Sequence, residues 1–163
     1  MTWYPLEPAD ETFFDTAPYV HSYPVDLPVP PARVWAALTS DQSLGAWRLP
    51  VRSLTWTSPR PFGIGTTREV VLSGRTLSIR ERFFRWEEGT RMSFAAVECD
   101  RNLLRRFAED YVVAERPGGS RFTWTIATEP VPKARALFAA SDPLNAIAYR
   151  AVPRAAKKFF ASG

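Results

Sequence analysis

The chain is poor in the two residues that most often bind metal ions, with one cysteine and one histidine among its 163 residues. The single cysteine, Cys99, excludes an internal disulfide and is typical of a protein in a reducing compartment such as the cytoplasm. The single histidine, His21, cannot build a site of several histidines, and there is no cysteine pair to replace one. We therefore expect no metal site and no other cofactor.

Long apolar runs are also missing. No segment approaches the ~20 consecutive apolar residues that a membrane-spanning helix requires. The first residues carry Asp10, Glu11 and Asp15 in place of a cationic and apolar leader, so we expect no secretory signal and a cytoplasmic location. With 45% apolar residues, the chain can form one sizeable core. We expect an N-terminal arm over residues 1–17, lying on the body or partly loose, and one domain over residues 18–163.

Common catalytic and phosphate-binding motifs are absent as well. The sequence has no Gly-x-Ser-x-Gly and no His-Glu-x-x-His. Gly63-Ile64-Gly65 lacks a third glycine and precedes strand-type residues rather than a helix, so it predicts a turn and not a phosphate loop.

The basic charge is interleaved with acids. The net charge is +4 and the pI is about 9.6. Runs such as Arg80-Glu81-Arg82 are typical of side chains that pair on neighbouring strands. A one-sided basic stripe occurs near the end of the chain, at Arg150, Arg154, Lys157 and Lys158. Because no recognised motif accompanies this stripe, we expect no nucleic-acid partner.

The apolar periodicity divides the chain into a strand, a helix, many strands and a final helical region. Residues 19–27 alternate as a strand does, and residues 31–39 begin with a proline and repeat apolar residues at helical spacing. Ser40 or Asp41 can cap a second short helix toward Trp47. Strand patterns then follow, separated by turns, over residues 49–57, 66–72, 75–86, 91–99, 106–115 and 121–128. No helix separates these strands, which predicts an antiparallel meander.

The final region predicts a long helix with one apolar face. Asp142 and Pro143 indicate a break and a restart, with Asp142 as the cap, and Pro153 predicts a kink. One apolar stripe follows at Leu144, Ile147, Ala148, Ala151, Val152, Ala155 and Phe159. The whole pattern predicts a sheet curled around this helix, with a pocket between them.

Several of these segments resemble the START-like (SRPBCC) superfamily. The resemblance covers about residues 19–160, and its most specific pieces are VPPARVWAALTSDQSLGAW, GIGTTREVVL, LSIRERFFRWEEGTRMSF and RFAEDYVVAERPGGSRFTWTIATEP. The chain looks most like actinobacterial members labelled polyketide cyclase or dehydrase. The resemblance implies an α+β helix-grip fold: an antiparallel sheet of about seven strands wraps around a long C-terminal helix and leaves an apolar cavity. Two short helices are expected after the first strand.

His21 shares a strand face with Tyr19 and Tyr23, the face that we assign to the interior. It is a candidate general base or a hydrogen-bond partner for a ligand carbonyl, because an imidazole titrates near neutral pH. The alternative is a histidine at the end of the sheet that bonds to backbone or water.

Glu81 lies in the same alternation as Leu77, Ile79 and Phe83, which should face inward. A carboxylate among apolar neighbours needs a raised pKa or a partner such as an inward arginine. A register slip by one residue would instead place Glu81 in solvent. Both interpretations stand at this point.

Glu109 and Tyr111 alternate with Phe107 and Val113, next to Trp124 across the following turn. With Glu81 they predict a small polar cluster in an apolar cavity, suited to orienting a ligand carbonyl or hydroxyl or to assisting enolisation. The alternative is a buried hydrogen-bonded pair that sets the strand register.

Three functions remain, all of which use the cavity. The first is binding of a hydrophobic small molecule such as a lipid, a polyketide or an isoprenoid, by a monomer or homodimer. The second is a cofactor-free cyclase or dehydratase acting on a poly-carbonyl chain, with Glu81, Glu109, Tyr111 or His21 moving protons. The third is a peripheral lipid-transfer protein whose basic stripe contacts membranes weakly. The predicted ligand-binding residues are His21, Tyr23, Trp56, Glu81, Phe83, Phe94, Glu109, Tyr111, Trp124 and Ile147.

Overall fold

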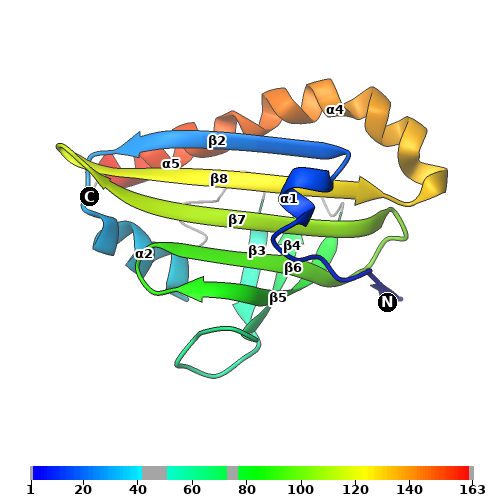
Figure 1. Ribbon diagram of the computed structural model, residues 1–163, viewed down its shortest axis with the longest axis horizontal. Helices are drawn as coiled ribbons and strands as arrows, with labels where there is room; N and C mark the ends of the chain where they lie inside the picture. Colours follow the sequence, from blue (N-terminus) through cyan, green and yellow to red (C-terminus); the bar gives the residue numbers. More distant parts are fainter. Residues whose placement is uncertain (1, 42–50, 73–76, 162–163) are drawn as a thin grey trace.

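The computed structural model describes residues 2–41, 51–72 and 77–161 of the chain (Figure 1). The strands are β1 (Tyr4–Pro5), β2 (Tyr19–Leu27), β3 (Val51–Trp56), β4 (Thr67–Leu72), β5 (Ser78–Glu87), β6 (Arg91–Cys99), β7 (Leu104–Arg116) and β8 (Gly119–Pro130). The helices are α1 (Phe13–Thr16), α2 (Pro31–Thr39), the 3-10 turn η2 (Pro132–Ala134), α4 (Arg135–Tyr149) and α5 (Ala151–Ala161).

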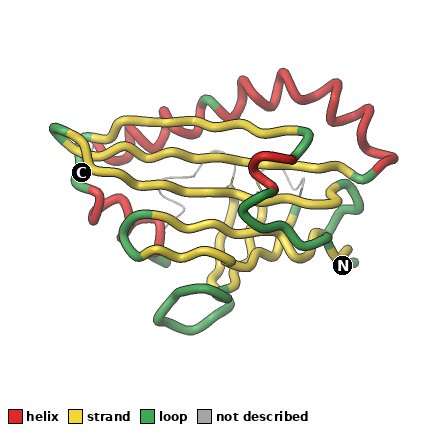
Figure 2. The backbone as a smooth tube through the Cα atoms, in the orientation of Figure 1, coloured by secondary structure: helices red, strands yellow, loops and turns green. Residues whose placement is uncertain are grey.

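Seven strands form one antiparallel sheet in the order β2-β8-β7-β6-β5-β4-β3. β3 to β8 follow one another as a meander, and β2 closes the far edge beside β8. Helices α4 and α5 run along one side of this curved sheet, as Figures 1 and 2 show. The expected α+β helix-grip fold is confirmed, and the strand at residues 19–27 and the helix at residues 31–39 have the predicted bounds. The expected second short helix toward Trp47 lies outside the described residues.

The sheet bends where its strand register shifts. Shifts occur between Val51 and Ser53 in β3, between Arg80 and Glu81 in β5, and between Leu104 and Arg106 in β7. An extra residue on one strand bends that strand and increases its twist. The concave face that results carries the main core, which includes Phe83, Phe94 and Phe122 from the sheet, Val34, Trp35 and Leu38 from α2, and Val152 and Phe160 from α5.

The N-terminal residues are attached to the outer, convex face of the sheet. The pairing of β6 with β7 covers Arg91–Ala95, and β1 pairs with the far end of β6, where Tyr4 lies opposite Cys99. The Glu7 amide then donates to the Arg105 carbonyl of β7 at 2.9 Å. Helix α1 lies over the sheet (Figure 1) and buries Phe13 in a small cluster of alanines from β6, β7 and β8.

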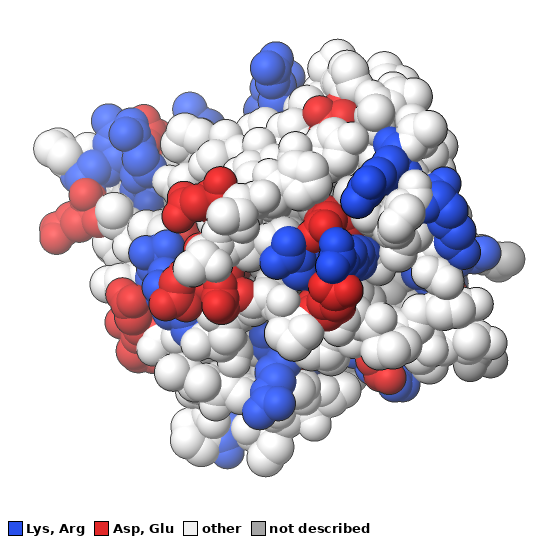
Figure 3. Space-filling model, turned by 45° about the vertical axis from the view of Figure 1, so that its right-hand side comes forward, with Lys and Arg blue, Asp and Glu red and all other residues white. Residues whose placement is uncertain are grey.

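The interleaved surface charges pair across strands, as the sequence predicts. Arg80 lies opposite both Glu69 and Glu98 in the register and makes ion pairs with them at 3.2 and 2.8 Å. Asp26 lies opposite Arg121 and is paired with it at 2.8 Å. Figure 3 shows acidic and basic side chains adjoining one another on one face of the molecule.

The predicted geometry of the last helical region is wrong in two respects. Helix α4 continues through Asp142 and Pro143, and the break falls at Arg150 instead. Pro153 then lies in the first turn of α5, where its missing N–H costs no helical hydrogen bond. Because the break shifts the helical phase, Leu144 and Ile147 face outward, 69% and 64% exposed. The core is contacted instead by Val152, Pro153, Ala156 and Phe160 of α5.

Candidate ligand-binding cavity

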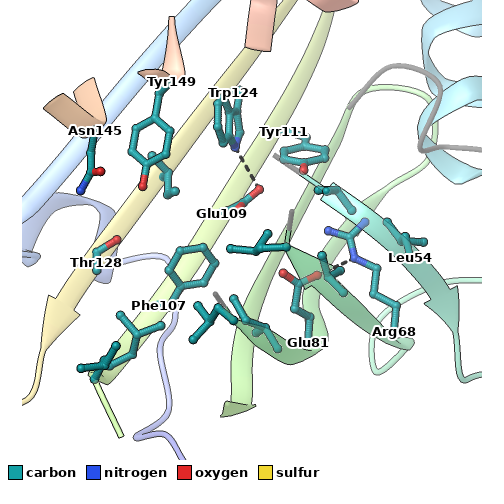
Figure 4. A pocket seen from close by; sticks show the side chains of 18 of the residues that line it. Leu54, Arg68, Glu81, Phe107, Glu109, Tyr111, Trp124, Thr128, Asn145 and Tyr149 are labelled. Atoms are coloured by element: carbon teal, nitrogen blue, oxygen red, sulfur yellow. Dashed lines mark hydrogen bonds and ion pairs between the residues drawn. The ribbon is translucent and has the colours of Figure 1, made fainter. Parts of the chain in front are cut away.

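A cavity of about 340 Å3 lies between the concave face of the sheet and helix α4 (Figure 4). Most of its wall is apolar and comes from Val51, Leu54, Val70, Leu72, Leu77, Ile79, Leu103, Leu104, Phe107, Trp124, Ile126 and Phe138. Its polar lining residues are Arg68, Glu81, Glu109, Tyr111, Thr128, Asn145 and Tyr149. The hollow that the sequence predicts between the sheet and the last helical region is therefore present.

An ion pair lies at one end of the cavity. Arg68 of β4 and Glu81 of β5 are direct cross-strand partners, and Arg68 Nε donates to Glu81 Oε2 at 2.5 Å. Their side chains are 5% and 4% exposed. The guanidinium carbon of Arg68 lies 4.1 Å from the ring centroid of Phe94 and 5.1 Å from that of Phe83. Aromatic faces therefore stabilise the cation where water is largely excluded.

The attraction between Arg68 and Glu81 offsets part of the cost of burying both charges. Burial raises the pKa of Glu81, and the adjacent Arg68 opposes that rise. Burial also disfavours the cationic form of Arg68, but Glu81, Tyr111 and Glu109 together outweigh this effect and keep the pKa of Arg68 above its usual value. The pair thus brings a permanently charged guanidinium to the wall of the cavity.

Glu109 is the second carboxylate of the site, and no ion pair joins it to a cation of the described residues. Trp124 Nε1 donates to Glu109 Oε2 at 2.9 Å. Burial, and then the charge of Glu81, raise the pKa of Glu109 to about 7, against the opposing effects of Arg68 and of hydrogen bonds from Tyr111 and Trp124. Glu109 therefore exchanges a proton near neutral pH. Burial raises the pKa of Tyr111 well above its usual value, so its hydroxyl keeps its proton.

Helix α4 closes the cavity with Phe138, Asn145 and Tyr149. Figure 4 shows Asn145, Tyr149 and Thr128 on the side of the cavity away from Arg68. The ring of Tyr149 makes an edge contact with Trp124 at 5.6 Å between centroids. Burial raises the pKa of Tyr149 to about 12, so this hydroxyl is also neutral at physiological pH. The far end of the cavity is thus polar but uncharged.

Two predicted residues of β2 hold α4 in place and do not line the cavity. His21 Nε2 lies 2.7 Å from Asp142 Oδ1, and the Tyr23 hydroxyl donates to the Ala146 carbonyl at 3.1 Å. Asp142, predicted to cap a helix, is therefore a partner of His21 across the sheet edge. The sequence offered a general base or a ligand partner at His21, or alternatively a bond to backbone or water, and the partner in the structure is the Asp142 side chain of α4.

The other predicted residues divide into three groups. Glu81, Glu109, Tyr111 and Trp124 come together on the cavity wall, and the inward register of Glu81 is the correct one. Trp56, Phe83 and Phe94 pack behind that wall around the Arg68 guanidinium. Ile147 points away from the cavity, so the expectation that it lines the pocket is wrong.

Sequence reasoning missed Arg68 and Tyr149. The signal for Arg68 was present, because it shares its strand phase with Val70 and Leu72, which also line the cavity. An arginine in the apolar phase of a strand is the inward partner that Glu81 requires. Tyr149 had no comparable signal, because its orientation depends on where α4 ends.

The curved sheet, the gripped helices and the hollow between them define a member of the START-like superfamily. Residues 21–161 match the model of the family described as polyketide cyclase / dehydrase and lipid transport, and the chain belongs to this family.

A mycobacterial relative and two solved structures are also similar to this chain. The uncharacterized protein Rv2574 of Mycobacterium tuberculosis is 38% identical over 156 residues, which cover 96% of this chain and 93% of the relative. TTHA0849 from Thermus thermophilus superposes with a TM-score of 0.67 at 19% identity, over 88% of this chain and 96% of that one. Ara h 8.0201 superposes with a TM-score of 0.59 at 16% identity, over 89% and 99%. At these identities the two structures show the shared fold alone.

The buried pair predicts a double-mutant cycle. Arg68→Met or Glu81→Leu alone leaves one buried charge without its partner and should lower the free energy of unfolding by roughly 3–5 kcal/mol. The double variant removes both charges and should cost much less than the sum of the two single changes. Urea unfolding of the four proteins measures this coupling. Costs that simply add would show that the two side chains do not stabilise one another.

Proposed function

We propose that this protein binds a hydrophobic small molecule, such as a lipid, a polyketide or an isoprenoid, in the cavity between the sheet and α4. The observation that carries the proposal is a hollow of about 340 Å3 with apolar walls and a few convergent polar groups. Small-molecule sites typically have this composition and volumes of roughly 300–1,000 Å3. Membership of a family described by cyclase, dehydrase and lipid transport supports the same class of ligand.

Apolar burial supplies most of the affinity in such a site. A ligand that buries roughly 300 Å2 of apolar surface gains about 7.5 kcal/mol at ~25 cal/mol per Å2. The loss of translational and rotational freedom offsets much of this gain. The polar groups then decide which ligands bind and in which orientation, because each buried polar atom of the ligand requires a partner.

A cavity-filling substitution tests the proposal. Leu54 of β3 lines the cavity, whereas its neighbour Thr55 is exposed on the other face of the same strand. Leu54→Trp should weaken binding of the neutral fluorescent probe aminoanthracene at least tenfold, and Thr55→Trp should leave it unchanged. Fluorescence titration measures both, with circular dichroism as the check on folding. Equal binding by the two variants would place the probe outside the cavity and contradict the proposal.

A cyclase or dehydratase is a second candidate, favoured by the raised pKa of Glu109 beside a neutral tyrosine. A general base is most effective when its pKa lies near the working pH. If the protein turns over a poly-β-ketone, Tyr111→Phe should abolish product formation and leave binding of the chain within about threefold. Product analysis by mass spectrometry decides this. A protein that binds the chain but forms no product is a carrier.

Transfer of lipids at a membrane is the third candidate, and the outer face of α4 favours it. Leu137, Leu144 and Ile147 are 59%, 69% and 64% exposed on this helix. Its single acid, Asp142, is engaged by His21, and exposed cations flank it at Lys133, Arg135, Arg150 and Arg154. An apolar helix face with basic flanks suits an anionic membrane surface. Among the described residues, no helix is long and apolar enough to cross a membrane.

Vesicle binding tests this candidate. Ile147→Glu should abolish co-flotation with vesicles of phosphatidylcholine and phosphatidylglycerol in equal parts, and binding of the unaltered protein should weaken with added salt. Ile64→Glu is the matched control, because Ile64 is 74% exposed in the loop between β3 and β4 and the charge change is the same. Binding that is absent, insensitive to salt or lost equally in both variants contradicts a docking role for α4.

A further inference from the structure

The guanidinium of Arg68 offers donors to the cavity beyond the one that holds Glu81. An arginine has five N–H donors in a planar fork. Within residues 2–41, 51–72 and 77–161, this guanidinium donates one hydrogen bond, from Nε to Glu81. The terminal nitrogens belong to a side chain that is 5% exposed and lines the cavity. A buried donor without an acceptor is costly, so these nitrogens favour a ligand that brings oxygens to them.

The shape of these terminal donors points to a particular kind of oxygen group. The two terminal nitrogens of a guanidinium form parallel hydrogen bonds with a group that carries two oxygens in one plane, as a carboxylate does. Aromatic rings lie against the guanidinium, with Phe94 at 4.1 Å, and restrict approach to its remaining edge. A single hydroxyl would satisfy one terminal nitrogen and leave the other unpaired.

An anion bound by Arg68 would share the cavity with the Glu109 carboxyl group. Three titratable groups change the pKa of Glu109, namely Arg68 of β4, Glu81 of β5 and Tyr111 of β7, and Glu109 in turn raises the pKa of Tyr149 of α4. The two tyrosines keep their protons, and Glu81 is held by Arg68 at 2.5 Å. Glu109 is therefore the group that can change its charge when a second anion enters. Two carboxylates that share a site force one of them to take a proton.

We propose that the natural ligand is an amphiphile with an anionic oxygen head, of which a carboxylate is the simplest. The terminal nitrogens of Arg68 bind the head, its apolar body fills the cavity, and Glu109 takes up one proton from solvent as the head enters. Protonated Glu109 then presents an O–H donor to the ligand in place of a repelling charge. This inference rests on the proposed function and specifies the ligand class of that site.

A matched pair of amphiphiles tests the inference on the full chain. Decanoate and decanol have the same apolar body and differ in the head. Calorimetric titrations from about pH 6 to about pH 9, in two buffers of different ionisation enthalpy, measure affinity and the protons taken up. Decanoate should bind more tightly than decanol below about pH 7, where Glu109 is already protonated. Above that pH its affinity should fall roughly tenfold per pH unit, with uptake approaching one proton. Decanol should show neither effect.

Two variants assign the effects to residues. Glu109→Gln should bind decanoate with no pH dependence and no proton uptake. The double variant Arg68→Met with Glu81→Leu should lose at least tenfold in affinity for decanoate and keep its affinity for decanol. If that variant does not fold, Arg68→Lys replaces it, because lysine keeps the charge but lacks the planar fork.

The outcomes separate the two levels of the proposal. Equal affinity for decanoate and decanol overturns the acidic head and leaves the cavity as an apolar binding site. Decanoate binding above about pH 7 without proton uptake overturns the protonation of Glu109 on binding. Proton uptake that persists in Glu109→Gln overturns the assignment to Glu109. Failure of both amphiphiles and of aminoanthracene to bind overturns the proposed function itself.

Discussion

The curvature of the sheet is the constraint on which the cavity depends. A flat sheet would lie against α4 and α5 along its whole length and leave no space between the layers. The register shifts in β3, β5 and β7 bend the strands, and α5 then covers the end of the concave face that α2 also contacts. Toward the other end, α4 contributes no fully buried residue. The hollow is the part of the concave surface that this helix does not fill.

One of the register shifts also positions the charged end of the cavity. It lies between Arg80 and Glu81, directly beside the residue that pairs with Arg68. Replacing this buried pair by apolar residues would commonly be neutral or stabilising, so stability alone is a weak reason for it. Glu109 adds a second carboxylate, which no ion pair joins to a cation within the described part of the chain. A cluster of this kind on the wall of an apolar hollow is better explained by what enters the hollow than by the fold.

The sequence alone predicts the elements in which buried residues recur at the regular spacing of a strand or a helix. The alternation in residues 19–27 and the proline before residues 31–39 specify a strand and a helix without reference to the rest of the chain. The inward position of Glu81 follows from the same alternation. The orientation of the last helical region could not be obtained in this way, because Asp142-Pro143 has the pattern of a helix start and yet lies within α4. His21 provides the missing reason, since it engages the carboxylate that would otherwise cap a helix. Sequence pattern contains no information about such a contact between residues far apart in the chain.

The same contact explains why α4 differs from α5. Helix α5 is anchored by Val152, Pro153, Ala156 and Phe160, all buried in the core. Helix α4 is held at its middle by the His21–Asp142 and Tyr23–Ala146 hydrogen bonds and by partly buried rings at Phe138 and Tyr149. Segments with little buried apolar surface open at lower free energy than the core does. Helix α4 is therefore expected to open at lower free energy than α5.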